Sequence, residues 1–168
     1  MKKLVVMAMA AVMIFATSCQ KAATPVANRD AKMLNFKVMD VNDQTIDMRK
    51  HLGKVVILDF WDTWCGPCRR EIPHFIELYD QYRPKGLEIV GVAFGRNGKE
   101  AVKQFTTEMK MNYASALFNP EAQGLFGAPN SIPTTYIINQ NGEIVEKVVG
   151  YRDKSYFEER IKTLLKLS

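Results

Sequence analysis

The stretch that most constrains how this chain folds is residues 55–68, VVILDFWDTWCGPC, in which an apolar run leads into two cysteines. Residues 55–58 have the composition of a buried strand, and helix-like sequence directly follows Cys68. A Cys-x-x-Cys pair at a strand-to-helix junction is typical of a redox site. A thiol in the first helical turn faces unpaired backbone N–H groups and the positive end of the helix dipole, which favour its thiolate. The spacing therefore predicts Cys65 as the exposed attacking thiol and Cys68 as the resolving thiol.

Other uses of the cysteine pair are less well supported by the sequence. A structural zinc ion needs four ligands, and the chain offers no second Cys pair and no His pair. Haem attachment of the c type needs a His directly after the second Cys, where Arg69 stands. We therefore expect no metal and no cofactor beyond a redox-active disulfide of Cys65 and Cys68. A reduced pair of this kind can hold Cu(I), so a copper carrier is an alternative function.

These residues also carry a family resemblance. The sequence DFW followed by WCGPC resembles thioredoxin, and its wider setting is similar to the TlpA/ResA group of membrane-tethered thiol–disulfide oxidoreductases. The resemblance covers residues 33–167 and implies an α/β thioredoxin fold, a central mixed β-sheet flanked by helices, with an N-terminal β-hairpin extension. A thiol peroxidase shares this fold, but the residues before Cys65 lack the Pro and Thr of the peroxidase pattern, so this alternative ranks last.

The N-terminal end resembles a bacterial lipoprotein signal. Residues 1–18 combine a basic start with an apolar stretch that is short for a membrane span, and small residues precede Cys19. Cleavage there would leave Cys19 as a lipid-bearing N-terminus, and the alternative is simple cleavage with an unmodified Cys19. Residues 19–32 are small and polar and are interpreted as a flexible tether. Residues 33–168 then form the thioredoxin-like domain.

Periodicity predicts the order of the elements in that domain. After a hairpin of two short strands, we expect the order β-α-β-α-β-β-α. The sequence also predicts helix N-caps at Asn97 and at Ser155, each followed by a Glu three residues later. The predicted hairpin strands are 36–39 and 45–48, the later strands are 55–60, 87–94, 115–118, 135–138 and 144–149, and the helices begin near residues 66, 98 and 156.

The resemblance implies further site residues around the cysteines. Gly66 and Pro67 resemble the dipeptide between the cysteines of the reducing members of the superfamily. The reduction potential of thioredoxin is about −270 mV, whereas that of the oxidant DsbA is about −120 mV. A reductase is therefore favoured over an oxidase. Ile132 and Pro133 resemble the cis-proline site, whose exposed backbone can pair with an extended substrate chain. Trp64 is expected to form an apolar rim where substrates dock.

Asp59 matches the buried acid of thioredoxins, six residues before the first cysteine. Burial disfavours the charged form of a carboxyl, so we expect the pKa of Asp59 to be raised. A base with a pKa near neutrality can accept a proton from a thiol and return it, and we expect Asp59 to do so for Cys68. The alternative is a structural hydrogen bond at the end of the strand.

Other polar residues near the motif are given plainer interpretations. An acid at position 62 would disfavour a nearby thiolate, and we expect Asp62 to point into solvent instead. Arg69 and Arg70 either favour the Cys65 thiolate or form a solvated helix face, and the sequence leaves both open. Trp61 is assigned to the core, and His51 and His74 to the surface. The loop 126–133 is one residue longer than is usual in the family, near Pro129, which is expected to alter the substrate groove.

The expected partners follow from the resemblance. They are protein disulfide substrates, among which apocytochrome c is one family example, and a membrane dithiol electron donor of the DsbD/CcdA kind. The expected location is the bacterial cell envelope, facing the periplasm, with the lipid on Cys19 holding the protein to a membrane. The formal net charge of +5 includes Lys2 and Lys3 of the signal segment, and the small excess that remains indicates no nucleic-acid binding.

Overall fold

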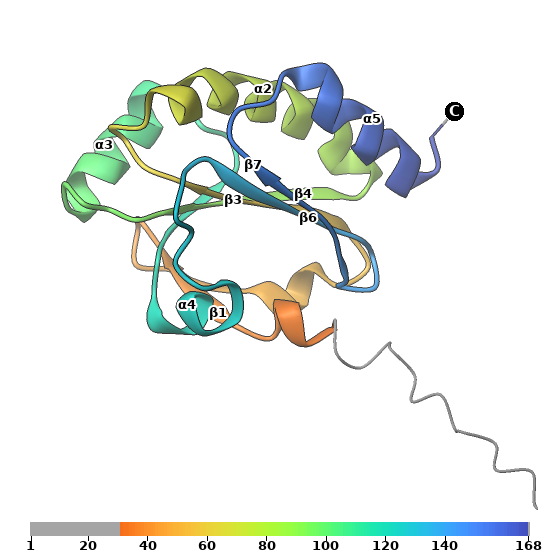
Figure 1. The fold of residues 1–168 in the computed structure, drawn as a ribbon, viewed down its shortest axis with the longest axis horizontal. Helices are drawn as coiled ribbons and strands as arrows, with labels where there is room; N and C mark the ends of the chain where they lie inside the picture. Colours follow the sequence, from red (N-terminus) through yellow and green to blue (C-terminus); the bar gives the residue numbers. More distant parts are fainter. Residues whose placement is uncertain (1–30, 168) are drawn as a thin grey trace, which may run out of the picture.

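The computed structural model describes residues 31–167, in which a seven-stranded mixed sheet is covered by helices on both faces (Figure 1). The strand order is β2-β1-β5-β4-β3-β6-β7, with β3, β4 and β5 parallel and the remaining pairs antiparallel. The strands are β1 (Lys37–Asp40), β2 (Thr45–Asp47), β3 (Val55–Trp61), β4 (Leu87–Ala93), β5 (Ala114–Leu117), β6 (Thr134–Ile138) and β7 (Ile144–Val149).

The helices lie in two layers. Helices α2, α3 and α5 cover one face of the sheet, and α4 covers the other together with the N-terminal segment (Figure 1). Three short 3-10 helices complete the chain. The helices are α2 (Gly66–Tyr82), α3 (Lys99–Glu108), α4 (Pro120–Phe126) and α5 (Lys154–Leu165), and the 3-10 helices are η1 (Ala31–Leu34), η2 (Met48–His51) and η3 (Arg83–Lys85).

The predicted thioredoxin order and the N-terminal hairpin are confirmed, and α4 is an additional helix that the sequence analysis missed. Every residue of β3 and β4 is buried, because both strands have helices on each face. Successive side chains of β3 point to opposite faces, so Val55 and Ile57 pack under α2 and α5 while Val56 and Leu58 face η1 and α4. The motif strand is therefore an interior strand of the sheet, and its end is rigidly held.

Two predicted helix caps are wrong. The N-cap of helix α3 is Gly98 and not Asn97, and no side chain caps the helix. Gly98 has a φ of 87°, a backbone conformation that favours glycine. Helix α5 is capped by Asp153, whose carboxylate accepts the backbone N–H of Tyr156 at 3.0 Å, and Ser155 donates its hydroxyl to the same carboxylate. A carboxylate is a stronger acceptor than a hydroxyl at the positive end of a helix, which explains the earlier start.

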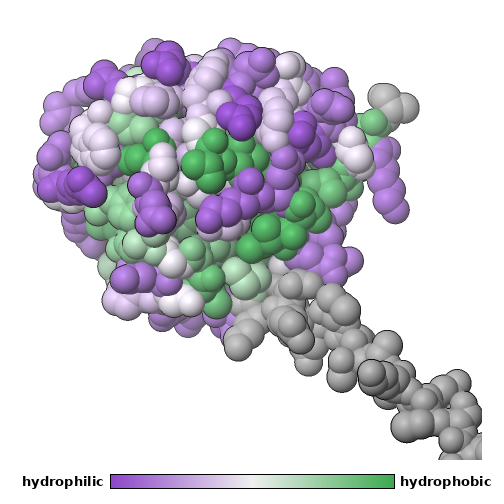
Figure 2. Space-filling model, viewed as in Figure 1, coloured by the Kyte–Doolittle hydropathy of each residue, from purple (hydrophilic) through white to green (hydrophobic). Residues whose placement is uncertain are grey.

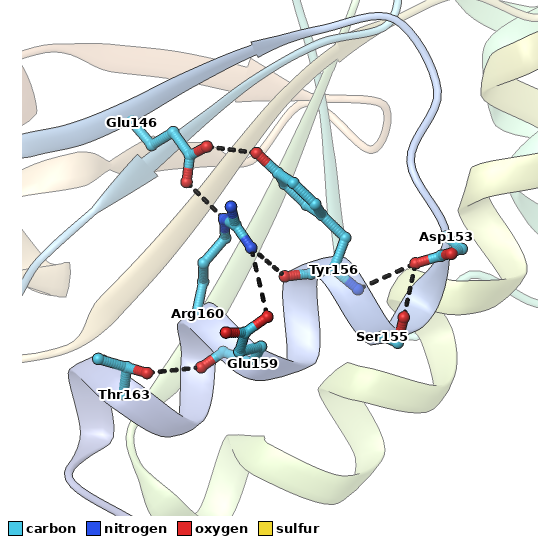
Figure 3. A network of polar contacts seen from close by, with 7 residues as sticks. All are labelled: Glu146, Asp153, Ser155, Tyr156, Glu159, Arg160 and Thr163. Atoms are coloured by element: carbon cyan, nitrogen blue, oxygen red, sulfur yellow. Dashed lines mark hydrogen bonds and ion pairs between the residues drawn. The ribbon is translucent and has the colours of Figure 1, made fainter.

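A polar network fastens α5 to the edge strand β7 (Figure 3). The side chain of Arg160 donates to Glu146 at 2.6 Å, its guanidinium stacks on the ring of Tyr156, and the Tyr156 hydroxyl donates to Glu146. Figure 2 shows hydrophobic residues gathered across the middle and lower part of one face, with hydrophilic residues around them. Val145 and Val149 of β7 are about half exposed, as expected for alternate residues of an edge strand.

The two histidines differ from the surface placement that the sequence predicted. The side chain of His51 is only 16% exposed, and its Nδ1 lies 3.2 Å from a carboxylate oxygen of Glu88. His74 is partly buried against the ring of Tyr151. Within residues 31–167, no helix is long and apolar enough to cross a membrane. The predicted signal segment, Cys19 and nearly all of the tether lie outside the described residues.

Candidate active site

Cys65 and Cys68 form a disulfide at the junction of β3 and α2, with an S–S distance of 2.07 Å. Cys65 is the N-cap of α2, and its Sγ accepts the backbone N–H of Cys68 at 3.2 Å. Pro67 occupies the first turn, where a missing N–H costs nothing, and Gly66 has open space around its Cα. Cys68 is fully buried and Cys65 is only 3% exposed, so the prediction that Cys65 is exposed is wrong, although it is the less buried of the two in the disulfide form. The helix start that the sequence predicts at Gly66 is confirmed.

The loop before β6 brings a second segment to the cysteines. The Ile132–Pro133 peptide bond is cis, as predicted, and the carbonyl oxygen of Ile132 lies 3.7 Å from Cys65 Sγ. Trp64 is half exposed beside Cys65, while Trp61 is fully buried against the ring of Phe105. The residues that the sequence singles out at 64–68 and 132–133 therefore meet in one place.

A groove of about 490 Å³ opens next to the disulfide. Its walls are formed by Trp64, by two aromatic residues that follow β4 and β5, and by residues 128–132 of the longer loop. The lining residues are Trp64, Phe94, Arg96, Phe118, Ala128, Pro129, Asn130, Ser131 and Ile132. The loop near Pro129 thus forms one wall of the groove, where the sequence expects an altered shape.

Asp59 lies in the middle of β3, paired in register with Gly91 of β4 and Thr135 of β6. Its side chain is buried, and one carboxylate oxygen accepts the hydroxyl of Thr135 at 3.0 Å. Burial raises the pKa of Asp59 to about 7, and the Thr135 hydrogen bond opposes that rise. The expected direction of the pKa shift is confirmed. Within the described residues, no hydrogen bond joins Asp59 to Cys68.

A second buried carboxyl, Glu71, was missed by the sequence analysis. It lies on α2 three residues after Cys68 and is fully buried. One carboxylate oxygen accepts the backbone N–H of Arg152 at 2.8 Å, and the other has no protein partner within residues 31–167. Burial raises the pKa of Glu71, and repulsion from Asp59 raises it further. The signal that could have found it is its spacing, since Glu71 shares the buried helical face of Cys68 and Phe75.

Asp62 is buried, so the prediction that it points into solvent is wrong. One carboxylate oxygen accepts the backbone N–H of Thr63 at 2.7 Å, and the other accepts the backbone N–H of Arg96 at 3.2 Å. These two donors replace the water that the carboxylate loses, which explains why burial is tolerated. Asp62 also ties the loop before Cys65 to the loop after β4.

The arginines around the site stack on aromatic rings. The guanidinium of Arg69 lies 5.4 Å from the ring centre of Phe105, and that of Arg70 lies 5.3 Å from Tyr151. Both side chains are exposed, and neither forms an ion pair within the described part of the chain. The placement agrees with a solvated helix face, while their charges still lie one turn from the cysteines.

A disulfide at the start of the helix after an interior strand, beside a cis-proline loop, defines a thioredoxin-fold enzyme of the thiol–disulfide oxidoreductase class. Residues 29–147 match the AhpC/TSA family, and the chain belongs to this family within the thioredoxin superfamily.

The chain is also similar to proteins named thiol-disulfide oxidoreductase ResA. It is 33% identical to the one from Bacillus anthracis over 131 residues, which cover 77% of this chain and 75% of the relative. It is 36% identical to the one from Bacillus subtilis (strain 168) over 122 residues, covering 72% and 67%. The identity and coverage support the enzyme class that the site defines.

Solved structures agree with this assignment. A thioredoxin-family thiol:disulfide interchange protein from Chlorobium tepidum TLS superposes with a TM-score of 0.72 at 28% identity, over 77% of this chain and 92% of that chain. StoA from Bacillus subtilis superposes with a TM-score of 0.63 at 25% identity, over 74% and 93%. The predicted fold class is confirmed.

Proposed function

We propose that this enzyme reduces protein disulfides in the bacterial cell envelope through the dithiol of Cys65 and Cys68. The observation that carries the proposal is the position of Cys65. It caps α2, where helix N–H groups favour a thiolate, and it adjoins the groove and the Ile132 backbone. Cys68 is fully buried and is bonded to Cys65 in the disulfide.

The proposed reaction has two exchange steps. The Cys65 thiolate attacks one sulfur of a substrate disulfide, forming a mixed disulfide and releasing one substrate thiolate. Cys68 then loses its proton and attacks the Sγ of Cys65, which releases the second substrate thiol and closes the Cys65–Cys68 disulfide. Two electrons and two protons pass from the dithiol to the substrate, and no cofactor is required.

Asp59 is proposed as the base for the second step. Its pKa is raised to about 7, so a proton can be accepted and returned near neutral pH. No direct contact joins it to Cys68 in the oxidised form, so the transfer would pass through a movement of the thiol or through water. The hydrogen bond from Thr135 fixes the orientation of the carboxyl.

The groove is proposed to bind an extended segment of the substrate. Trp64 supplies the apolar rim, and Gly66 with Pro67 forms the open start of α2 next to it. The cis bond before Pro133 exposes the backbone of Ile132, which makes no backbone hydrogen bond within the described residues. An extended chain can pair with such a strip, as in strand addition at a sheet edge.

Envelope location and membrane attachment are part of the same proposal. Residues 1–18 would act as a signal peptide, a lipid on Cys19 would anchor the protein, and residues 19–32 would tether the domain. The start of the described chain and the β3–α2 junction lie at opposite ends of the molecule (Figure 1), so the cysteines would face away from the anchor. A membrane dithiol of the DsbD/CcdA kind would return the protein to the dithiol form, and apocytochrome c is one possible substrate.

Trapping tests the assignment of the two cysteines. Cys68→Ser in cells should accumulate mixed disulfides between Cys65 and substrate proteins, because the resolving thiol is absent. Cys65→Ser is the matched control and should accumulate none. Separating the adducts on non-reducing gels would show the difference. If Cys65→Ser forms the adducts and Cys68→Ser does not, the roles of the cysteines are reversed.

The direction of electron flow has its own test. Gly66 and Pro67 favour a reductase, so equilibration with glutathione buffers should give a potential near that of thioredoxin, about −270 mV. A reduction potential of about −120 mV, the value of DsbA, would contradict the assignment as a reductase. Loading the reduced protein with Cu(I) and following both the metal and free thiols on a sizing column would test the carrier alternative. Stoichiometric retention of copper without disulfide reduction would favour that alternative.

A further inference from the structure

We infer that the groove beside Cys65 selects substrate segments that carry an acidic side chain near the reacting cysteine, and that Arg96 binds this acidic side chain. The inference rests on the proposed reduction of protein disulfides and specifies the class of substrate. Arg96 is the one charged residue among the nine that line the groove.

The guanidinium of Arg96 is held in place but has unused donors. It lies 5.1 Å from the ring centre of Trp64, the residue next to Cys65. Its side chain forms no ion pair and no hydrogen bond with residues 31–167, although a guanidinium carries five N–H donors. These donors have no acceptor within residues 31–167, and the edge of a guanidinium matches a carboxylate in a two-bond contact.

The backbone at this position is also fixed. The N–H of Arg96 donates to the carboxylate of Asp62, and the backbone N–H of Cys65 donates to the carbonyl of the same Asp62. One buried residue therefore sets both the start of the Arg96 side chain and the cysteine loop. Arg96 is held at a defined place relative to Cys65, which a recognition residue requires.

The charges around the groove favour an acidic partner. Asp62 is buried, does not line the groove and has both oxygens occupied by backbone donors. Arg69 and Arg70 directly follow Cys68 and add two exposed positive charges. None of Arg69, Arg70 and Arg96 forms an ion pair within residues 31–167, and the carboxylate of Asp62 is buried, so the exposed charges next to the disulfide are positive and attract a negative substrate segment.

The apolar part of the groove limits where the carboxylate can bind. Phe94, Phe118 and Ile132 form apolar wall, and the backbone of Ile132 can pair with the main chain of the substrate. Burying a carboxylate against such a surface is costly, whereas a contact with the exposed Arg96 leaves it partly hydrated. The substrate acid therefore binds at the rim, while its neighbours cover the wall.

Synthetic disulfide-linked peptides test the inference. Each peptide has one cysteine, through which two copies are joined by a disulfide. The four positions nearest the cysteine, two before it and two after it, are varied one at a time to Asp, Asn, Lys or Phe. Reduced wild-type protein is mixed with each peptide, and the fall in dithiol is followed by Trp fluorescence. At one or more positions, the Asp peptide should react about two- to five-fold faster than the Asn peptide, and the Lys peptide more slowly. Added salt should reduce the difference.

Three variants separate recognition from general effects. In Arg96→Gln the Asp-to-Asn rate ratio should fall to about one, and in Arg96→Glu the order should reverse so that Lys peptides react fastest. Arg83→Gln is the matched control, because the guanidinium of Arg83 also lies over a ring, that of Tyr79. Arg83 follows the C-terminal end of α2, about 25 Å along the helix from Cys65. This variant should keep the wild-type ratio.

The outcomes distinguish this inference from the proposed function. If the wild type reduces none of the peptides, the proposed reduction of disulfides fails. If the wild type reduces all peptides at equal rates, or if Arg96→Gln leaves the Asp-to-Asn rate ratio unchanged, the role of Arg96 is overturned while the proposed reduction of disulfides stands. If Phe peptides react fastest and do so equally in Arg96→Gln, the groove selects apolar side chains, and the assignment to acidic segments is wrong.

Discussion

Asp59→Asn is expected to stabilise the oxidised protein above neutral pH. Asp59 is buried, and within the described residues the Thr135 hydroxyl is its one side-chain hydrogen-bond donor. Burial raises its pKa from 3.8 to about 7. Because the folded-state pKa lies above the unfolded one, the stability that this carboxyl contributes is fully present below about pH 4 and is lost as the pH rises through about 7.

The size of the effect follows from the width of that pH range. Each unit between the two pKa values costs the folded state about 1.4 kcal/mol, so the loss over about three units is about 4 kcal/mol. An Asn keeps an acceptor for Thr135 but adds buried N–H donors without partners, which costs about 1–3 kcal/mol at every pH. The variant should therefore be less stable than the wild type near pH 4 and more stable by about 1–3 kcal/mol above about pH 8. Relief of the repulsion on Glu71 acts in the same direction.

Urea unfolding followed by Trp fluorescence, with the disulfide closed, gives the free energy of unfolding from about pH 4 to about pH 9. Asp62→Asn is the matched control, since Asp62 is equally buried but accepts two backbone N–H bonds. It should lose about 1–3 kcal/mol at neutral pH, because an amide has one acceptor oxygen where the carboxylate has two. A wild-type to Asp59→Asn difference that stays constant across this pH range would refute burial as the cause.

Three further experiments give clear expectations. Cys19→Ser should move the protein from the membrane fraction to the soluble fraction, and unchanged partitioning would count against lipidation. Asp59→Asn should slow resolution by Cys68 at neutral pH while leaving the first attack largely intact, and stopped-flow traces that show both steps unaltered would exclude it as the base. Gly91→Ala should lower stability by about 1–3 kcal/mol, because its Cβ would lie 2.8 Å from Nε1 of the fully buried Trp61, and unfolding at wild-type urea concentrations would contradict that clash.

The parts of the fold that follow from short-range sequence patterns could be predicted. The apolar run at β3 predicted a strand close to the observed bounds, since burial on two faces leaves a direct mark on composition. Helix α4 was missed because it has seven residues, too few for a helical period to stand out. The cap at Asp153 was missed because Ser155 and Glu158 fit the same pattern two residues later.

The local part of the site could be predicted for the same reason. A cysteine at the N-cap of a helix and a second one in its first turn are fixed by helix geometry alone, so Cys65 and Cys68 are placed by their spacing. The cis bond before Pro133 was expected from the resemblance, and no local pattern would have given it. The groove needs the ends of β4 and β5 to meet the loop before β6, which only the folded sheet brings together.

The raised pKa of Asp59 could be predicted from its place in an apolar strand, but the partners of the other buried acids could not, because one donor to each lies far away in the sequence. One carboxylate oxygen of Asp62 accepts the N–H of Arg96, 34 residues later, and one of Glu71 accepts the N–H of Arg152, 81 residues later. The other oxygen of Glu71 has no protein partner within residues 31–167. Asp59 receives a hydroxyl bond and no backbone bond within the described residues. Both carboxylate oxygens of Asp62 accept backbone N–H groups. Burial raises the pKa of Asp59 and of Glu71. A carboxyl near a redox pair is consequently assigned to structure or to proton transfer by counting its donors in the folded protein.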